Sequence, residues 1–216
     1  MPKGLFITFE GTEGSGKSTQ VSLLAERLRS IGHVVRTLRE PGGTPIGEEI
    51  RHTLKHSLAN AAMTGETELL LMNASRAQLV REVIRPALAA GEIVLCDRFY
   101  DSTTAYQGHG RQLKLDMVKS VIDVAVGETR PDLTLLLTVS QEISEMRRAM
   151  RQATLPFMRD RIEEADRGFF DRVAKGYEAI AAAEPKRVCV IDANGKIESL
   201  GMAIWKLVEP LLEKKG

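Results

Sequence analysis

Cysteine and long hydrophobic runs are scarce in this sequence. Its 216 residues include two cysteines, Cys96 and Cys189, and both stand in apolar stretches far apart in the chain. Such isolated residues are typical of small buried side chains in a reducing compartment, and they exclude a disulfide framework and a cysteine zinc site. No apolar run approaches the roughly 20 residues that a membrane-spanning helix needs.

Aromatic side chains and net charge are low as well. Aromatic residues make up 5% of the chain, and the formal net charge is +1. So small a charge gives no general attraction to nucleic acid or to a membrane surface, and basic side chains matter only where they cluster. The N-terminal residues lack the basic, apolar and small-residue pattern of a signal peptide. We therefore expect a cytoplasmic protein that binds neither nucleic acid nor membrane.

The rest of the composition is that of a soluble globular protein, with 43% hydrophobic and 27% charged residues. The length suits a single domain spanning residues 1–216. Short apolar runs alternate with longer segments of helical periodicity, which predicts an α/β fold. The expected strands are 5–10, 34–38, 93–97, 133–139 and 187–192, and the expected helices are 17–31, 66–90, 115–126, 141–151, 162–183 and 197–214.

The expected strands are nearly continuous hydrophobic runs. This pattern is typical of parallel strands that are covered on both faces. We therefore predict a five-stranded parallel sheet flanked by helices on both faces. Two segments, 40–45 and 152–160, fit neither the strand nor the helix pattern.

The segment GTEGSGKS at residues 11–18 matches the phosphate-loop pattern G-x-x-x-x-G-K-[ST] in full, between an expected strand and an expected helix. Its backbone N–H groups and the helix N-terminus favour phosphate oxygens. Lys17 is expected to reach the β- and γ-phosphates of a nucleotide, and the Ser18 hydroxyl to bind Mg²⁺. The predicted ATP site comprises Gly11, Thr12, Glu13, Gly14, Ser15, Gly16, Lys17, Ser18 and Thr19.

Asp97 ends the expected strand 93–97, and Arg98 follows it directly. A carboxylate at the end of a buried strand next to a phosphate loop is well placed to organise Mg²⁺ and its waters. A guanidinium there suits a second anionic group, such as an acceptor phosphate. The alternative is that the two residues pair with each other or with solvent. We predict a catalytic role for Lys17, Asp97 and Arg98, with Ser18 and Asp97 as the magnesium ligands.

Arginines also gather around the irregular segment 152–160, namely Arg147, Arg148, Arg151, Arg159 and Arg161. A lid at about 148–162 that carries arginines onto the γ-phosphate would neutralise charge in phosphoryl transfer. A basic stripe for nucleic acid is the alternative, but the only aromatic residue in that stretch is Phe157.

Several segments together resemble the bacterial thymidylate kinase family of nucleoside monophosphate kinases. They are TFEGTEGSGKSTQ, REPGGTPIGEEIR, ASRAQL, DRFYDSTTAYQG and RPDLTLLLTV, and the similarity runs in order from about residue 5 to about residue 192. This combination is far more specific than the phosphate loop. The resemblance implies that Mg-ATP and dTMP react to ADP and dTDP, a step of dTTP synthesis, on a parallel sheet flanked by helices in a homodimer.

The resemblance also implies how the acceptor nucleotide is held. Glu13 matches the position of the acidic residue that contacts the sugar 3′-hydroxyl, in keeping with the repulsion between a carboxylate and ATP phosphates. Arg39, Arg51 and Arg98 match positions that hold the acceptor phosphate. Arg76 matches the arginine that bonds the thymine edge.

Four more residues of the DRFYDSTTAYQG segment and its surroundings belong to the implied dTMP site. Tyr106 matches a tyrosine that packs against the deoxyribose, and Gln107 lies close to the same place. Ser102 and Thr103 fall where base-contacting polar residues are found.

The sequence departs from the family pattern in two places. Met72 stands where the family usually has a phenylalanine that stacks on thymine, and a thioether packs on a ring with less defined geometry. A kinase of another nucleoside monophosphate or of a deoxynucleoside therefore stays open. The lid segment is longer than usual; Arg151 is the first choice for its catalytic arginine, followed by Arg148 and Arg159.

A nucleotide-dependent switch is the alternative from a different class. Its guanine-specifying N-K-x-D motif is absent, because the similar segment ANGK at 193–196 lacks the aspartate. A switch would hold or hydrolyse a nucleotide without an acceptor, whereas a kinase needs a second nucleotide. His52 and His56 have a spacing that zinc can use, but without a third ligand a solvated helix face is favoured.

Overall fold

The computed structural model describes residues 4–154 and 166–213, with the side chains of residues 58, 148 and 151–154 excepted. Its sheet has five parallel strands in the order β2-β3-β1-β4-β5. The strands are β1 (Leu5–Glu10), β2 (Val35–Arg39), β3 (Ile93–Asp97), β4 (Leu133–Thr138) and β5 (Val188–Asp192). The predicted fold class is confirmed, and each strand lies within one residue of its expected bounds.

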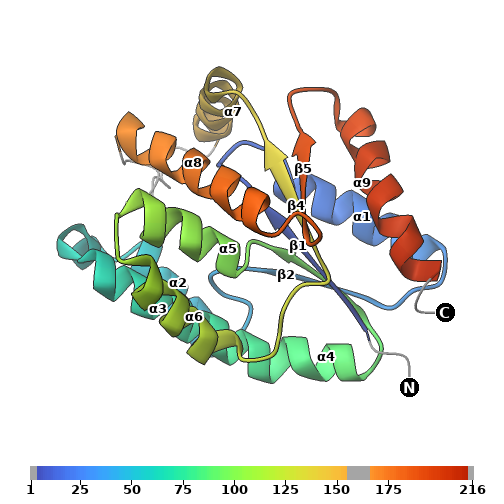
Figure 1. Ribbon diagram of the computed structural model, residues 1–216, viewed down its shortest axis with the longest axis horizontal. Helices are drawn as coiled ribbons and strands as arrows, with labels where there is room; N and C mark the ends of the chain where they lie inside the picture. The colour runs from blue at the N-terminus through green and yellow to red at the C-terminus, as the bar shows by residue number, and fades with distance from the viewer. Residues whose placement is uncertain (1–3, 155–165, 214–216) are drawn as a thin grey trace.

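Both faces of the sheet are covered, as Figure 1 shows. Successive residues of a strand point to opposite faces, so Ile7 and Phe9 pack under α1 (Lys17–Ser30) and α9 (Ile197–Glu213). Phe6 packs on the other side, against the helices that follow β2 and β3. Burial on two sides explains why these strands are hydrophobic without alternation.

The second face carries the longer helical layer. It comprises α2 (Pro45–Lys55), η1 (Leu58–Ala62), α3 (Gly65–Leu79), η2 (Val80–Ile84), α4 (Arg85–Ala89), α6 (Leu115–Val126) and α8 (Arg167–Ala183), while α7 (Gln141–Thr154) follows β4 at the carboxyl end of the sheet. The expected helix 66–90 is thus one helical run, with a wider π turn at η2 just before Pro86. A proline lacks the N–H for a regular helical bond, and the wider turn accommodates it.

The segments of α2 and η1 and residues 100–110 were not among the expected helices. Residues 100–110 form α5 (Tyr100–Thr103) and η3 (Thr104–Gly110). The glycines on either side of His109 in the sequence predict a mobile loop, but His109 lies in η3 and packs against α8, where a Cβ at Gly176 would come within 2.8 Å of its ring. The loop expectation was therefore wrong. The helix is hidden from the sequence because it buries polar side chains.

The register of the sheet brings three strand ends together. Arg39 and Phe9 are both aligned with Asp97, at the carboxyl ends of β2, β1 and β3. In parallel sheets this edge is where ligands bind. Among residues 4–154 and 166–213, none of the helices is long and apolar enough to cross a membrane.

Candidate active site

The loop between β1 and α1 has a backbone that requires glycine. Gly11, Gly14 and Gly16 have φ values of 132°, 75° and 91°. A Cβ at Gly11 would lie 2.2 Å from the carbonyl oxygen of Leu137, and one at Gly14 2.9 Å from that of Ser144. Side chains of other residues would be strained here. The predicted ATP residues 11–19 thus form a tight loop and the first turn of α1, a shape suited to phosphate oxygens.

Lys17 is the buried cation of this loop. Its ammonium donates to the carbonyl oxygens of Gly11 at 3.1 Å and Thr12 at 2.8 Å. Burial and the positive charge of Arg98 lower the pKa of Lys17 to about 8, although nearby carboxylates oppose the shift. A polyphosphate in the loop would supply negative charge that favours the ammonium form.

Ser18 and Asp97, the two predicted magnesium ligands, meet directly. The Ser18 hydroxyl donates to a carboxylate oxygen of Asp97 at 2.5 Å. No group of three or more histidine, cysteine or acidic residues in the described ranges could hold a metal by itself. A hydroxyl and a carboxylate fit Mg²⁺, which takes oxygen ligands and shares them with waters and substrate phosphates. They do not form a closed metal cage.

Arg98 joins the phosphate loop to the neighbouring pocket. Its guanidinium pairs with Glu13 at 2.8 Å, donates to the Gly11 carbonyl at 3.0 Å, and lies over the ring of Tyr106. Burial alone would raise the pKa of Glu13, but the charges of Arg98 and Lys17 outweigh it and hold that pKa well below its usual range. Glu13 is therefore an anion that faces a cation, Arg98, on the side of the loop where the pocket lies.

A pocket that is partly open to solvent lies beside Glu13 and Arg98. Its lining contains most of the predicted dTMP residues: Glu13, Met72, Arg76, Arg98, Ser102, Thr103, Tyr106 and Gln107, together with Glu40, Pro41 and Lys55, which sequence reasoning had missed. These residues come from the phosphate loop, the segment after β2, α2, α3, the end of β3 and the α5–η3 run that follows it. The fold thus gathers residues from distant parts of the chain around one pocket.

Arg39 and Arg51 are in the predicted dTMP set but do not line this pocket. Both donate to the carbonyl oxygen of Pro41, which does line it, at 3.4 Å and 2.8 Å. Arg39 also pairs with Glu48 at 3.1 Å and has an exposed fraction of 50%. Both side chains therefore stand beside the pocket, next to the lining residue Pro41.

A sequence model of the family described as Thymidylate kinase matches residues 9–204. The chain belongs to the thymidylate kinase family. A thymidylate kinase of Syntrophotalea carbinolica is 46% identical over 212 residues, which is 98% of each chain. One of Alcanivorax borkumensis is 47% identical over 208 residues, or 96% of this chain and 97% of the other.

A solved structure agrees with these relatives. The crystal structure of thymidylate kinase from Ehrlichia chaffeensis matches with a TM-score of 0.76 and 33% identity, covering 96% of this chain and 99% of that one. The family resemblance predicted from the sequence is confirmed by the three comparisons together.

In this member of the thymidylate kinase family, Arg76 is the more deeply buried of the two arginines that line the pocket. It is 2% exposed, and its guanidinium donates to Glu40, Asn73, Thr103 and the Phe99 carbonyl at 2.7 to 3.1 Å. The partner Glu40 lies in the segment between β2 and α2. Burial raises the pKa of Glu40 although Arg76 opposes it, and its Oε1 makes no hydrogen bond to a described residue.

Gln107 and Tyr106 are fixed from behind the pocket. The Gln107 amide donates to the buried Glu68 of α3 at 2.7 Å, and Glu68 also pairs with Arg111. The ring of Tyr106 packs edge-on against Phe169 of α8. Burial raises the pKa of Tyr106 to about 12, with Arg98 opposing, so its hydroxyl stays protonated at neutral pH.

Glu10 and Tyr177 complete the site and were missed. Glu10 ends β1, is fully buried, and accepts hydrogen bonds from the Ser102 hydroxyl at 2.6 Å and the Tyr177 hydroxyl at 2.9 Å. Ser102, expected to contact the base, therefore bonds Glu10 and Arg98. The signal for Glu10 was a lone acid at the end of an apolar strand, while nothing in the sequence pointed to Tyr177.

The lid prediction lies mostly outside the described residues. This holds for Arg159 and Arg161 and for the side chains of Arg148 and Arg151. Of the arginine group Arg147 is described, and it donates to the Gly14 carbonyl at 3.1 Å. Helix α7 therefore rests against the phosphate loop.

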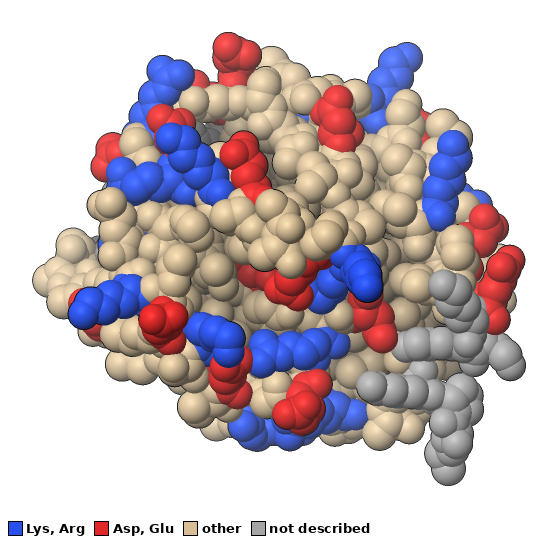
Figure 2. All heavy atoms as spheres, viewed as in Figure 1, with Lys and Arg blue, Asp and Glu red and all other residues tan. Residues whose placement is uncertain are grey.

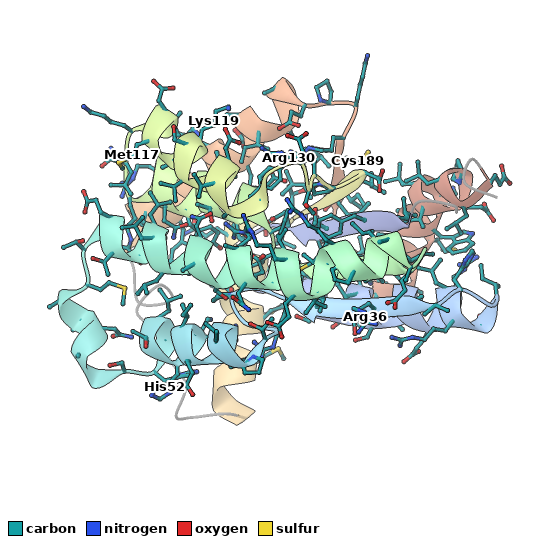
Figure 3. The ribbon with its side chains drawn as sticks, turned by 90° about the horizontal axis from the view of Figure 1, so that it is seen from below. Arg36, His52, Met117, Lys119, Arg130 and Cys189 are labelled. Atoms are coloured by element: carbon teal, nitrogen blue, oxygen red, sulfur yellow. The ribbon has the colours of Figure 1, made fainter. Side chains whose placement is uncertain are left out.

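Neither the nucleic-acid-binding stripe nor the zinc site at His52 and His56 finds support in the described residues. On the face shown in Figure 2, basic side chains are interspersed with acidic ones, unlike a continuous nucleic-acid-binding stripe. His52 lies on the outer side of α2 in Figure 3, and its ring is 6.0 Å from that of His56. The pair is a solvated helix face.

Proposed function

We propose that this chain is a dTMP kinase, which transfers the γ-phosphoryl group of ATP to dTMP and forms ADP and dTDP. The observation that carries the proposal is the shared border of two sites: Glu13 and Arg98 belong to the phosphate-loop surroundings and also line the acceptor pocket. Two anionic substrates bound on either side of these residues would have their phosphates next to each other. Family membership supports the identity of the acceptor.

The reaction needs positioning more than proton transfer. An anionic oxygen of the dTMP phosphate attacks the γ-phosphorus in line, the bond to the β–γ bridging oxygen breaks, and ADP leaves. The attacking oxygen is already deprotonated at neutral pH, so no general base is required. Lys17 and Arg98 would neutralise charge on the two phosphate groups while the walls exclude water.

Mg²⁺ would be held by Ser18 and Asp97 together with phosphate oxygens. When bound, it neutralises charge on the transferred group. The two side chains fit this role because they offer two oxygen ligands at the end of the loop and leave the other positions to substrate and water. Arg151 remains our proposal for the lid arginine.

We also propose a homodimer built from one kinase domain spanning residues 1–216. Large apolar side chains are exposed on α3 and α6, which lie side by side in Figure 3: Leu70, Met117 and Val124, with exposed fractions of 58%, 38% and 76%. An isologous contact would bury this face. Light scattering of the purified chain measures the mass directly, and Val124→Asp is expected to shift it to one chain.

A cytoplasmic location is also proposed, and free thiols support it. Cys96 and Cys189 are both free thiols, which suits a reducing compartment.

The proposed function is tested by ADP release from Mg-ATP with dTMP, dUMP, dCMP, dGMP, UMP and AMP offered in turn. We expect strong stimulation by dTMP, weaker stimulation by dUMP and little by the others. Preference for another monophosphate would keep a kinase but change its substrate, and would direct attention to Met72, which stands in the pocket. ADP release without any acceptor would indicate an NTPase or a switch instead.

A further inference from the structure

Glu10 has a place in the site that the proposed reaction does not use. It is the last residue of β1, directly before the phosphate loop, and its side chain is completely buried. One carboxylate oxygen accepts from the backbone N–H groups of Phe99 and Ser102, at 2.7 Å and 3.2 Å. The other accepts from the hydroxyls of Ser102 and Tyr177. The carboxylate therefore joins β1, α5 and α8.

The two hydroxyls also contact Arg98. Its Nη1 lies 3.1 Å from the Ser102 oxygen and 3.4 Å from the Tyr177 oxygen. A carboxylate can only accept hydrogen bonds. Each hydroxyl is therefore a donor to Glu10, and its lone pairs face the N–H groups of the guanidinium. The two hydroxyl oxygens also lie 3.0 Å apart, within hydrogen-bond distance of each other.

A neutral residue would hold the backbone at lower cost. A buried carboxylate without a cation in direct contact is expensive, and burial, followed by the charge of Asp101, raises the pKa of Glu10 to about 7. A glutamine could accept the same two backbone N–H groups. However, only a carboxylate has a second acceptor oxygen, to which both hydroxyls can donate. A negative charge at Glu10 is thus explained by the two hydroxyls that connect it to Arg98.

We propose that Glu10 is a positioning residue for Arg98, which it orients through the hydroxyls of Ser102 and Tyr177 so that the guanidinium is aimed at the acceptor phosphate. The inference rests on the proposed function, because the acceptor phosphate is the anion that Arg98 would bind. The inference adds Glu10 to the proposed site and states that the Ser102 and Tyr177 hydroxyls donate to it.

The decisive variant is Glu10→Gln. Its carbonyl can still accept from Phe99 and Ser102, so the backbone anchor is kept. Its amide must donate to the two hydroxyls, whose protons then turn toward Arg98 and repel it. We expect the KM for dTMP to rise about tenfold, the size of one lost charge-assisted hydrogen bond, with the KM for ATP within about twofold and the melting temperature not lowered.

A matched control is Glu92→Gln. Glu92 is also a carboxylate that accepts from an arginine, Arg36, but at the opposite end of the sheet, before β3 begins. This variant is expected to keep both KM values. It separates the loss of a carboxylate in general from the loss of Glu10.

Tyr177→Phe tests the route through the hydroxyls. It removes one acceptor from Arg98 and is expected to raise the KM for dTMP by a few fold, about half of the Glu10→Gln effect in free energy. If Glu10 acts through Tyr177, the double variant shows less than the product of the two single effects. Should Glu10→Gln fail to fold, Tyr177→Phe decides, and an unchanged KM for dTMP would then overturn the proposal.

The outcomes separate this inference from the proposed function. A wild-type chain that does not use dTMP would refute the function. A wild-type chain that uses dTMP, beside a folded Glu10→Gln variant with an unchanged KM for dTMP, would refute only the positioning role. Equal increases in both KM values would also refute it, because they would indicate a general disturbance of the site.

Discussion

Arg76 and Arg98 are two arginines of one pocket with opposite surroundings. Arg76 is 2% exposed, and its charge partner Glu40 is 3% exposed. Arg98 is 15% exposed, and its partner Glu13, on the phosphate loop, is 21% exposed. One ion pair is sealed inside the protein, whereas the other stands at the border of the pocket with water or ligand on one side.

The difference indicates what each arginine can do. Arg76 cannot change partner without leaving two buried charges apart, which costs several kcal/mol. It therefore suits a fixed, neutral target such as the edge of a base. Arg98 can exchange Glu13 for a phosphate, because Glu13 can turn to water or to a sugar hydroxyl. An exchangeable partner suits an anion that must arrive and leave in every turnover.

The largest expected effect is on the sealed pair. Glu40→Ala leaves the buried Arg76 without its carboxylate, and we expect the free energy of unfolding to fall by about 3–5 kcal/mol. Urea unfolding measures this. Glu13→Ala serves as the comparison and is expected to cost less stability, because the Glu13–Arg98 pair is partly exposed and water can reach Arg98 when the carboxylate is removed. Equal losses would show that the two pairs do not differ as described.

Arg98→Ala should affect catalysis more than stability. Removing the guanidinium from the acceptor phosphate is expected to lower kcat/KM for dTMP about 100-fold, or ~2.7 kcal/mol. Steady-state kinetics with varied dTMP measure the loss. Arg39→Ala is the matched variant at the rim and is expected to cost less, because that side chain is half exposed. A greater loss at Arg39 would place the acceptor phosphate at the rim.

Much of this site was predictable because its signals are local. The phosphate loop needs glycines and a lysine at fixed spacing, and apolar runs buried on both faces predict parallel strands. The family segments then placed Arg76, Arg98 and Gln107 in one pocket, which the structure forms. A motif records such positions even though they lie far apart in the chain.

The supporting residues were not predictable for the opposite reason. Residues 100–110 bury Ser102, Thr103 and Gln107, so the apolar periodicity that indicates a helix is missing. The bond between Glu10 and Tyr177 spans 167 positions in the sequence. No spacing rule reveals that a tyrosine on a late helix donates a hydrogen bond to an acid on the first strand.

Glu13→Gln tests the exchangeable pair of Glu13 and Arg98 without removing the side chain. The amide keeps the shape of the side chain but loses the charge that holds Arg98 and the strong acceptor for a sugar hydroxyl. We expect the KM for dTMP to rise about fivefold while the KM for ATP stays within about twofold. A rise in the KM for ATP alone would show that Glu13 acts on ATP and not on dTMP.

The last prediction concerns the KM for dTMP, which should depend on pH because Glu10 orients Arg98. The ionisable groups facing Glu10 are Lys17, Cys96, Arg98, Asp101, Tyr106 and Tyr177. The pKa of Glu10 is raised from 4.5 to about 7, first by burial and then by Asp101. Protonated Glu10 resembles the glutamine variant, so we expect the KM for dTMP to rise a few fold between pH 8 and pH 6.

The dTMP phosphate also titrates near pH 6, and Glu10→Gln isolates that contribution because the variant has no proton to lose. Stability should change in the opposite sense. A carboxyl whose pKa is raised on folding stabilises the fold fully below about 4.5, and the contribution is lost as the pH rises through about 7. The melting temperature of wild type relative to Glu10→Gln should therefore fall over the same range in which dTMP binding improves. If the melting temperatures of wild type and Glu10→Gln change in parallel between pH 6 and pH 8, Glu10 does not titrate in that range. Arg98 would then be oriented by a carboxylate throughout it.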